Sequence, residues 1–232
     1  RAQKISRLTQ GAFDLSYGSL DKRLWNFDQE MRSLPDPMEM ANSVRLIDYQ
    51  AIELDAANQT VFLRNKGMRI GFGGIGKGYA ADRAKRLLVN LGFQHGVVNA
   101  SGDMSAWGLN ERGLPWQVAI VDPDDPQKTI AHFDLTNAAV ATSGNYEKYV
   151  MIAGKKYSHT ISPKTGYPIQ GIKSVSVFAP VAELADALTT PIAVMGVEVG
   201  LDLVNQLKGI NCVIIDDDNR IYQSKNIIVS VT

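Results

Sequence analysis

The stretch Gly71-Phe72-Gly73-Gly74-Ile75-Gly76-Lys77-Gly78 stands directly before the strongest helical pattern in the chain. Beyond it, apolar residues recur at i, i+4, i+7, i+8 and i+11, at Ala80, Ala84, Leu87, Leu88 and Leu91. This spacing predicts a helix with one apolar face, ended by Gly92 in the C′ position. Glycines let a backbone come close to a ligand, and the amide groups of a helix N-terminus favour phosphate. The stretch therefore predicts an anion-binding turn that opens a helix.

Two known phosphate-binding motifs nearly fit this stretch. Gly71, Gly73 and Gly76 have the spacing of the dinucleotide fingerprint, but only residues 68–70 precede them and no acidic residue ends the next strand. The P-loop needs Ser or Thr after its lysine, and this chain has Gly78 there. Neither motif is complete. A tight turn whose glycines permit close helix–sheet packing is the structural alternative.

Short apolar runs predict strands, and helical patterns lie among them. Strands are expected at 44–47, 52–54, 61–63, 96–99, 117–121, 149–152, 175–178, 213–215 and 227–231. A hairpin turn is expected at Asn65-Lys66-Gly67, and a loop over 33–38, where two prolines stand close together. Further helices are expected at 2–8, after Pro180 and from about Glu198, with a break or kink near Thr190 caused by Pro191. Clustered strands with scattered helices favour an α+β fold.

Composition limits the classes of function. The chain has 232 residues, with 24 Lys and Arg against 24 Asp and Glu, so it lacks the positive field of a general nucleic-acid binder. No stretch reaches the ~20 apolar residues that span a bilayer. The single cysteine, Cys212, excludes an internal disulfide framework. The chain begins at Arg1, so we expect a processed product that an upstream signal peptide or lipid anchor has preceded.

Two further segments carry chemically useful side chains. His159 stands in a turn-rich segment over 158–168. Loops carry functional residues more often than cores do, which favours a functional role for it. A lone histidine, however, is usually structural. Asp186 and Thr190 are spaced i, i+4, so they share one face if the helix continues. A carboxylate and a hydroxyl are hard oxygen ligands that suit Mg²⁺. The alternative is a solvated Asp and a Thr bonded to its own helix.

These segments together resemble the FAD:protein FMN transferase family, the ApbE-like proteins. The matching segments, in chain order, are Gly11-Ala12-Phe13-Asp14 with Leu24-Trp25-Asn26-Phe27, Gly71–Ala80, Asn99-Ala100-Ser101-Gly102-Asp103, Ala141–Tyr146, His159–Gly166 and Ala185–Thr190. They resemble "GAFD…LWGF", "DLGGIAKGYA", "NIGGD", "ATSGDY", "HIIDPKTG" and "ADALAT". One such motif is weak, but all of them in the correct order are specific.

The resemblance implies a bacterial, Mg²⁺-dependent enzyme that cleaves FAD, attaches FMN through a phosphoester to Ser or Thr of an acceptor protein and releases AMP. Some members instead hydrolyse FAD as a pyrophosphatase, and a non-catalytic FAD-binding protein is a further alternative. It also implies an α+β fold with mixed sheets, packed helices and a flavin cleft between two lobes. We expect a single domain over 1–232 that lacks the family's N-terminal strand, located in the cell envelope.

The resemblance also implies site residues. Leu24, Trp25, Asn26, Gly71, Lys77, His159 and Ile161 would contact FAD. The carbonyl oxygen of Gly74 and the side chains of Asp186 and Thr190 would hold Mg²⁺. His159 and Asp186 would be catalytic, with His159 either taking the hydroxyl proton or only hydrogen-bonding the cofactor.

Three positions depart from the family pattern. Gly71 stands where many members have Asp, Ser162 replaces an Asp in a turn, and Asn26 replaces a common Gly. Ser162 can still make a side-chain bond to its turn, so we expect little loss there. Gly71 is the departure that bears most on cofactor binding.

Overall fold

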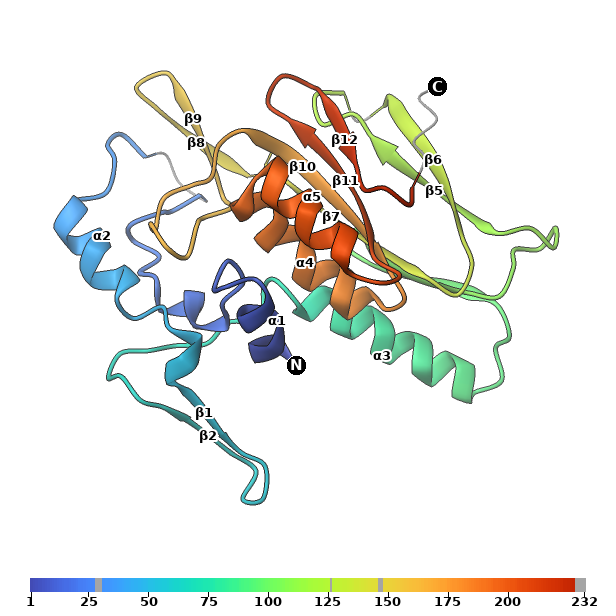
Figure 1. Cartoon of the computed structure of the whole chain (residues 1–232), viewed down its shortest axis with the longest axis horizontal. Coiled ribbons are helices and arrows are strands. Elements are labelled where there is room, and N and C mark those ends of the chain that lie inside the picture. Colours follow the sequence, from blue (N-terminus) through green and yellow to red (C-terminus); the bar gives the residue numbers. More distant parts are fainter. Residues whose placement is uncertain (28–30, 126, 146–147, 228–232) are drawn as a thin grey trace. The chain divides into compact units, whose positions relative to one another are not determined.

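The computed structural model describes residues 1–27, 31–125, 127–145 and 148–227. The chain divides into two compact units (Figure 1). The first is Arg1–Phe72 with Glu147–Gln170, and the second is Gly73–Tyr146 with Gly171–Thr232. Helices and sheets are mixed in sequence, which confirms the α+β class. In the described parts of the chain, no helix is both long enough and apolar enough to cross a membrane.

A six-stranded antiparallel sheet forms the frame of the second unit. Its strand order is β12-β11-β10-β7-β4-β3. The strands are β3 (Gly96–Ala100), β4 (Asp103–Trp107), β7 (Ala139–Gly144), β10 (Ile172–Ala179), β11 (Asn211–Asp216) and β12 (Ile221–Gln223). Strands β10 and β11 are buried along nearly their whole length, as expected for central strands covered on both faces.

The two faces of this sheet carry different layers, because side chains alternate along each strand. Val140, Val213 and Ile215 pack against a hairpin of β5 (Trp116–Val121) and β6 (Thr129–Leu135). On the other face, Ala139 packs against Ala81 and Ala182 from two helices. The helices on this face are α3 (Gly76–Asn90), α4 (Ala182–Met195) and α5 (Val197–Gln206).

Helices α3 and α4 cross at very short range, near their N-termini. A Cβ atom added to Gly78 would meet the carbonyl oxygen of Ala182 and lie 2.8 Å from Cβ of Asp186, so only glycine fits. Helix α4 has no side-chain cap of its own. Asp82 of α3 supplies one: its oxygens accept from the amides of Ala182 at 3.0 Å and Glu183 at 2.8 Å. At this crossing, a side chain of α3 therefore caps the N-terminus of α4.

The first unit contains short elements around an aromatic cluster. They are α1 (Ala2–Leu8), the 3₁₀ turns η1 (Leu15–Ser19) and η2 (Tyr49–Ala51), α2 (Pro37–Val44), the hairpin of β1 (Ile52–Asp55) and β2 (Thr60–Leu63), and the hairpin of β8 (Tyr149–Ile152) and β9 (Lys155–Ser158). The aromatic cluster consists of the buried residues Leu20, Leu24, Trp25, Met40, Val150, Ile152 and Ile161, with the rings of Phe27, Tyr157 and Tyr167 packed against them.

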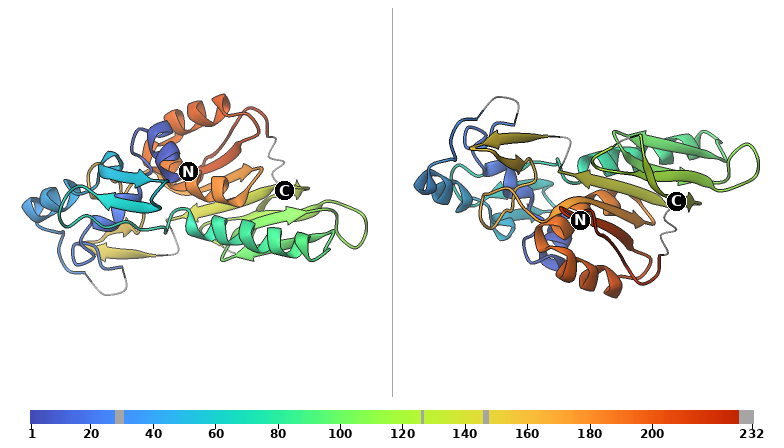
Figure 2. Two further views of the ribbon diagram at one scale, coloured as in Figure 1. Left: turned by 90° about the horizontal axis from the view of Figure 1, so that it is seen from below. Right: turned by 90° about the horizontal axis from the view of Figure 1, so that it is seen from above.

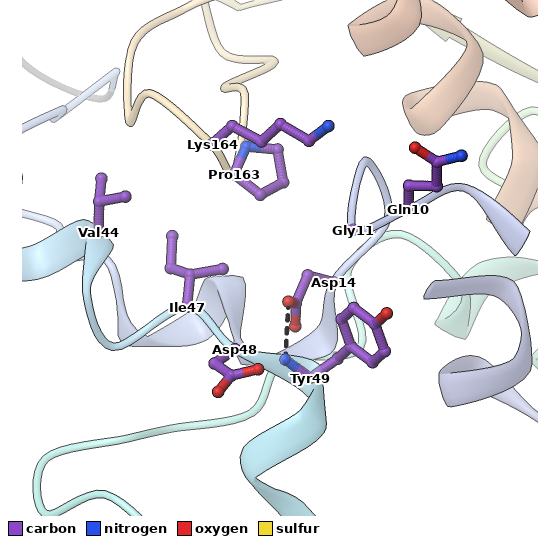
Figure 3. A pocket seen from close by; sticks show the side chains of 9 residues that line it. All are labelled: Gln10, Gly11, Asp14, Val44, Ile47, Asp48, Tyr49, Pro163 and Lys164. Atoms are coloured by element: carbon purple, nitrogen blue, oxygen red, sulfur yellow. Dashed lines mark hydrogen bonds between the residues drawn. The ribbon is translucent and has the colours of Figure 1, made fainter. Parts of the chain in front are cut away.

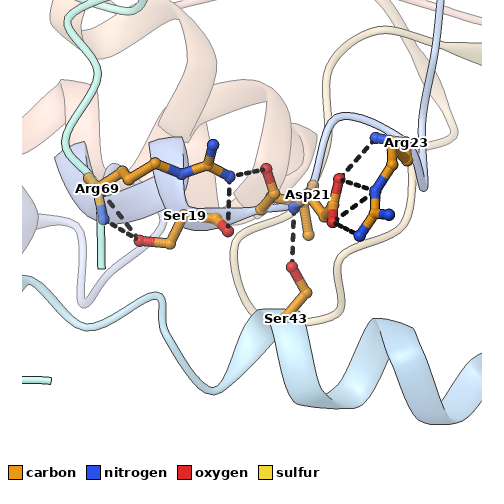
Figure 4. A network of polar contacts seen from close by, with 6 residues as sticks. Ser19, Asp21, Arg23, Ser43 and Arg69 are labelled. Carbon is orange, nitrogen blue, oxygen red and sulfur yellow. Dashed lines mark hydrogen bonds and ion pairs between the residues drawn. The ribbon is translucent and has the colours of Figure 1, made fainter. Parts of the chain in front are cut away.

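Polar contacts fix the chain just before the glycine-rich stretch (Figure 4). The amide of Arg69 donates to Ser19 Oγ at 2.9 Å, and this hydroxyl donates to the Arg69 carbonyl at 3.0 Å. The Arg69 guanidinium reaches the carbonyl oxygen of Leu20 at 3.4 Å. Gly71 donates its amide to the carbonyl of Leu15 at 2.9 Å. These bonds tie residues 69–71 to η1.

Several expected elements differ from the structure near the prolines. The strand expected at 44–47 is wrong, because α2 occupies Pro37–Val44 and a turn follows it. Pro37 is tolerated in the first turn, where its missing amide would be unpaired anyway. Asp36 accepts from the amides of Met38 and Glu39 at 2.9 Å and caps the helix. Of the break or kink expected near Thr190, the break is wrong, because α4 includes Pro191 and runs to Met195.

Two further expectations concern registers and faces. Strand β2 pairs with β1, Leu54 opposite Val61, so the hairpin turn lies at 56–59 and not at Asn65-Lys66-Gly67. Helix α3 ends at Asn90, with Gly92 in the predicted C′ position at a φ of +96°, but its apolar residues at 80, 87 and 91 are exposed. Its buried positions are Gly78 and Ala81. The strand expected at 227–231 lies almost entirely outside the described residues.

Gly78→Ala tests the helix crossing. We expect it to lower the free energy of unfolding by ~1–3 kcal/mol, because the added methyl group has to push two backbones apart. Gly73→Ala is the matched control, since nothing lies within 4 Å of a Cβ atom at Gly73. Urea titration of both variants measures the difference. Equal midpoints for the two variants would show that the crossing tolerates a side chain.

A candidate anion and cation site at the helix crossing

Three charged side chains meet where α3 and α4 begin. Lys77 Nζ lies 3.0 Å from Oδ1 of Asp103, and the amide of Gly78 donates to Oδ2 of Asp186 at 3.0 Å. The Asp103 side chain is 1% exposed, whereas that of Lys77 is 43% exposed. The structure thus brings the predicted residues Lys77 and Asp186 together. It adds Asp103, the last residue of the quoted motif at 99–103, which was not predicted as a site residue.

Burial and mutual repulsion dominate the electrostatics of the two carboxyl groups. Burial, followed by the charge of Asp186, raises the pKa of Asp103 to about 7, against the opposing effect of Lys77. Burial also raises the pKa of Asp186, while the Gly78 amide and the Lys77 charge lower it. Two carboxylates therefore share one ammonium group in a buried place, which leaves the cluster short of positive charge when both are ionised.

The predicted metal ligands fall in this same unit. Asp186 and Thr190 lie one turn apart on one face of α4, and Gly74 lies just before α3. Within the described residues, no group of three or more His, Cys, Asp and Glu side chains has metal-binding geometry. The predicted set instead combines a carbonyl, a carboxylate and a hydroxyl oxygen. Mg²⁺ prefers such hard ligands and often keeps several waters.

An unpaired atom supports a cation at this position. Among the described buried side chains, only Oδ2 of Asp103 and Oγ of Ser158 lack a hydrogen-bond partner. When both Asp103 and Asp186 are ionised, this buried oxygen has no donor, and a cation beside it would offset the cost of its burial. The residues present therefore fit a divalent cation.

His159, in the first unit, has one ring nitrogen engaged. Its Nδ1 lies 3.2 Å from the carbonyl oxygen of Lys148, and its amide donates to the same oxygen at 3.0 Å. A carbonyl can only accept, so this contact places the proton on Nδ1 and leaves Nε2 as the basic nitrogen. The half-buried ring is thus oriented as a proton acceptor through Nε2.

The other predicted flavin contacts of the first unit lie in its aromatic cluster. Trp25 is 4% exposed, Leu24 is 7% exposed and Ile161 is 4% exposed. The Trp25 ring lies 5.6 Å from that of Tyr157, and its Nε1 donates to the carbonyl of Gly166 at 2.7 Å. Their burial gives these side chains a packing role. Their contact with a flavin, and that of half-buried Asn26, stays a prediction.

Gly71 is free to carry a side chain. Its φ lies outside the left-handed region, and a Cβ atom there would meet Cα of Gly18 at 3.7 Å, an ordinary contact. The Asp that many family members have would therefore fit without backbone strain. The turn at Ser162 is closed by its main chain, because the amide of Gly166 donates to the Ser162 carbonyl at 2.8 Å.

The first unit also contains a cavity of about 310 Å³ (Figure 3). Asp14 is the buried carboxylate in it, and it accepts from the amide of Tyr49 at 2.9 Å. None of the predicted site residues lines this cavity. The lining residues are Gln10, Gly11, Asp14, Val44, Ile47, Asp48, Tyr49, Pro163 and Lys164.

An α+β fold with a lysine and two buried carboxyl groups at a helix N-terminus defines a protein suited to a phosphate ligand and a divalent cation. The chain belongs to the ApbE family, whose family model matches residues 1–214. It is 32% identical to the FAD:protein FMN transferase of Treponema pallidum, covering 98% of this chain and 67% of that protein. It is 33% identical to the Escherichia coli K12 protein of the same name, covering 88% of this chain and 59% of that protein.

Solved structures agree with the family assignment. The crystal structure of the ApbE protein from Thermotoga maritima has a TM-score of 0.88 and 33% identity, covering 97% of this chain and 73% of that chain. The flavin transferase ApbE from Vibrio cholerae has a TM-score of 0.84 and 28% identity, covering 97% of this chain and 72% of that one. The chain spans 59% to 67% of the length of the two curated relatives above.

Asp103→Asn tests the electrostatics of the cluster. The pKa of Asp103 rises from its ordinary value of 3.8 to about 7 on folding, so the folded state holds a proton that the unfolded chain has lost. In this range the contribution of Asp103 to the free energy of unfolding falls as pH rises, and this decline ends near pH 7. We expect the variant to lose this decline. Urea unfolding in EDTA at several pH values measures it, and parallel pH profiles for the two proteins would contradict it.

Proposed function

We propose that this chain is a Mg²⁺-dependent flavin transferase, which cleaves FAD and attaches FMN through a phosphoester to Ser or Thr of an acceptor protein. The observation that carries the proposal is the cluster of Lys77, Asp103 and Asp186 at the start of α3, in a chain of the ApbE family. The names of the relatives support flavin transfer as the reaction. A cell-envelope location and an upstream lipid anchor stay predictions of the resemblance.

The reaction is a displacement at the FMN phosphorus of FAD. The acceptor hydroxyl oxygen forms a new bond to this phosphorus, the bond to the bridging pyrophosphate oxygen breaks, and AMP leaves with the electron pair. The hydroxyl proton goes to a general base. The resemblance offers His159 for this role or for a hydrogen bond to the cofactor, and Nε2 is the ring nitrogen that the Lys148 contact leaves basic. With water in place of the hydroxyl, the products would be FMN and AMP.

The second unit supplies charge for the pyrophosphate. Lys77 is exposed enough to reach a ligand, and the amides at the start of α3 favour an anion. Asp186, with Thr190 and the carbonyl of Gly74, would hold Mg²⁺, and Asp103 adds a buried carboxylate beside them. A bound Mg²⁺ supplies stabilisation of the charge on the phosphoryl oxygens and the departing AMP.

The test of this function measures two products. The chain is incubated with FAD and Mg²⁺, alone and with a protein that the Vibrio cholerae flavin transferase modifies. AMP is measured by chromatography, and covalent flavin by fluorescence of the denatured acceptor. AMP and labelled acceptor that appear together support transfer. AMP without acceptor would replace the proposal by a pyrophosphatase, and binding of FAD with neither product would indicate a non-catalytic FAD-binding protein.

Asp186→Asn separates metal binding from folding. The amide keeps the size of the carboxyl group and can still accept from the Gly78 amide, but it loses the charge. We expect a loss of turnover of at least ~100-fold at limiting Mg²⁺, because metal stabilisation of the transition state is worth several kcal/mol. Isothermal titration with Mg²⁺ should show weaker binding, with an unchanged melting temperature in EDTA. Unchanged turnover in this variant would refute the metal site.

Lys77→Met distinguishes phosphate recognition from loop structure. We expect FAD affinity to fall by roughly tenfold, since a hydrogen bond to a charged group is worth about 1.5 kcal/mol or more, and riboflavin affinity to stay constant. Because the variant leaves Asp103 without its cation, Lys77→Met with Asp103→Asn is the matched control. Fluorescence titration with both flavins gives the affinities. Equal losses for FAD and riboflavin would assign Lys77 to the loop.

A further inference from the structure

Asp103 is fixed at the start of β4 by a tight turn. Ser101 and Gly102 form the two-residue turn between β3 and β4, with φ of +53° and +95°, both in the left-handed region, as in type I′ hairpins. The amide of Gly102 donates to Oδ1 of Asn99 at 2.8 Å, and Ala100 pairs with Asp103 across the turn. Helix α3 lies along β3 and β4 (Figure 2). The buried Asp103 carboxyl group therefore has a set position inside the second unit, at the start of α3.

Two carboxyl groups at this place share the charge of one lysine. Nζ of Lys77 lies 3.0 Å from Oδ1 of Asp103, while Oδ2 of Asp103 has no hydrogen-bond partner among the described residues. The carboxyl group of Asp186 is near enough to act on the charge of Asp103, and it accepts from the amide of Gly78. With both carboxyl groups ionised, the three side chains together are negative. Lys77 thus balances one of two buried carboxylates, and a second positive charge is needed to balance the cluster.

A divalent cation would compete with the Lys77 ammonium for the same oxygens. The ammonium is a point charge on a flexible stem, so it can follow a change in its surroundings. Mg²⁺ carries twice its charge and prefers hard oxygen ligands such as these carboxylates. Once Mg²⁺ lies beside Asp186 and Asp103, it offsets the attraction of Asp103 for the ammonium and repels the ammonium itself. A phosphate ligand at the start of α3 is then a stronger partner for Lys77 than Asp103 is.

We propose that Asp103 is a positioning residue that acts through Lys77. Before the cation binds, the Asp103 carboxylate holds the ammonium at the cation site, and when Mg²⁺ takes over that charge, the ammonium is released toward the FAD pyrophosphate. The inference rests on the proposed function, because it assumes a cation and a phosphate ligand at this cluster. It makes Mg²⁺ and FAD bind cooperatively through Lys77, so each ligand raises the affinity for the other by the same factor.

A permanent structural ion pair is the alternative role for Asp103 and Lys77. Such a pair would hold α3 against β4 and keep Lys77 in place whether or not a cation is bound. Removing either partner would then lower stability and change the affinities for all flavins alike. The two roles therefore differ in what the cation does to Lys77, and in whether the effect of Asp103 on FAD binding passes through Lys77.

Lysine acetylation tests the release of Lys77 without any turnover. The purified chain is treated briefly with an acetylating reagent in EDTA and in Mg²⁺, without FAD, above the pKa of Asp103 of about 7. Mass spectrometry gives the rate at each lysine, and isothermal titration measures Mg²⁺ binding. Lys173 is the matched control, because its ammonium is paired with Asp124 and Asn219 in the same unit. We expect Mg²⁺ to raise the rate at Lys77 by roughly threefold or more, since a freed amine is a better nucleophile, and to leave Lys173 unchanged.

The acetylation result separates this inference from the metal site itself. Mg²⁺ that binds while Lys77 reacts at the same rate, or more slowly, overturns the release of Lys77 and leaves the proposed function standing. Mg²⁺ that does not bind overturns the metal site and this inference together. In Asp186→Asn the effect of Mg²⁺ on Lys77 should disappear, and an effect that persists there comes from another site and overturns the proposal.

A double-mutant cycle tests whether Asp103 acts through Lys77. FAD and riboflavin affinities are measured in EDTA for the wild type, Asp103→Asn, Lys77→Met and the double variant, and melting curves verify that each is folded. Asp103→Asn should raise FAD affinity roughly tenfold while Lys77 is present, because the ammonium is released, but less than about threefold with Lys77→Met, where only a charge is removed. Riboflavin, which has no phosphate, should bind all four proteins alike. Equal gains for FAD in the two backgrounds, or equal changes for both flavins, would overturn the proposal in favour of a structural pair.

Discussion

The close crossing of α3 and α4 at Gly78 is the constraint on which the second unit depends. The backbone of α3 lies against the carbonyl of Ala182, and there is no room for a side chain between them. The crossing places the amide of Gly78 within 3.0 Å of Asp186, and the residue before it, Lys77, reaches Asp103 on β4. A larger residue at this one position would separate the two helix starts and disperse the charged cluster.

The same crossing lets the fold bury charge. Asp82 has both oxygens occupied, by two amides of α4 and the hydroxyl of Ser105, so its burial is compensated. Asp103 differs, because one of its oxygens has no donor in the part of the chain that the structure describes. Similar carboxylates on neighbouring elements thus have different roles. Asp82 stabilises the start of α4, whereas Asp103 keeps one carboxylate oxygen without a hydrogen-bond donor.

Much of the fold and part of the site could be predicted from the sequence. Local patterns predict the helices α3 and α4 and the strands β10 and β11. They also predict that Lys77 follows the glycine-rich turn at the start of a helix. Helix α2 was not predicted, because two nearby prolines indicate a loop. In the structure, Asp36 caps the helix and Pro37 occupies its first turn. Asp103 was missed as a site residue because its burial comes from contacts with α3 and with neighbouring strands that are distant in sequence. Such long-range burial leaves no local signal beyond the motif itself.

The face of α3 shows why hydrophobic periodicity misled at one point. Counting large apolar residues selects the leucine stripe as the buried side, yet a backbone-to-backbone crossing needs the smallest residues inward, and Gly78 and Ala81 provide them. The geometry that assembles the site therefore excludes the leucines from the core. Leu87 and Leu91 stay exposed, at 61% and 66%. The apolar period of α3 therefore does not identify the side of the helix that packs against α4 and the sheet, because that side is chosen by residue size.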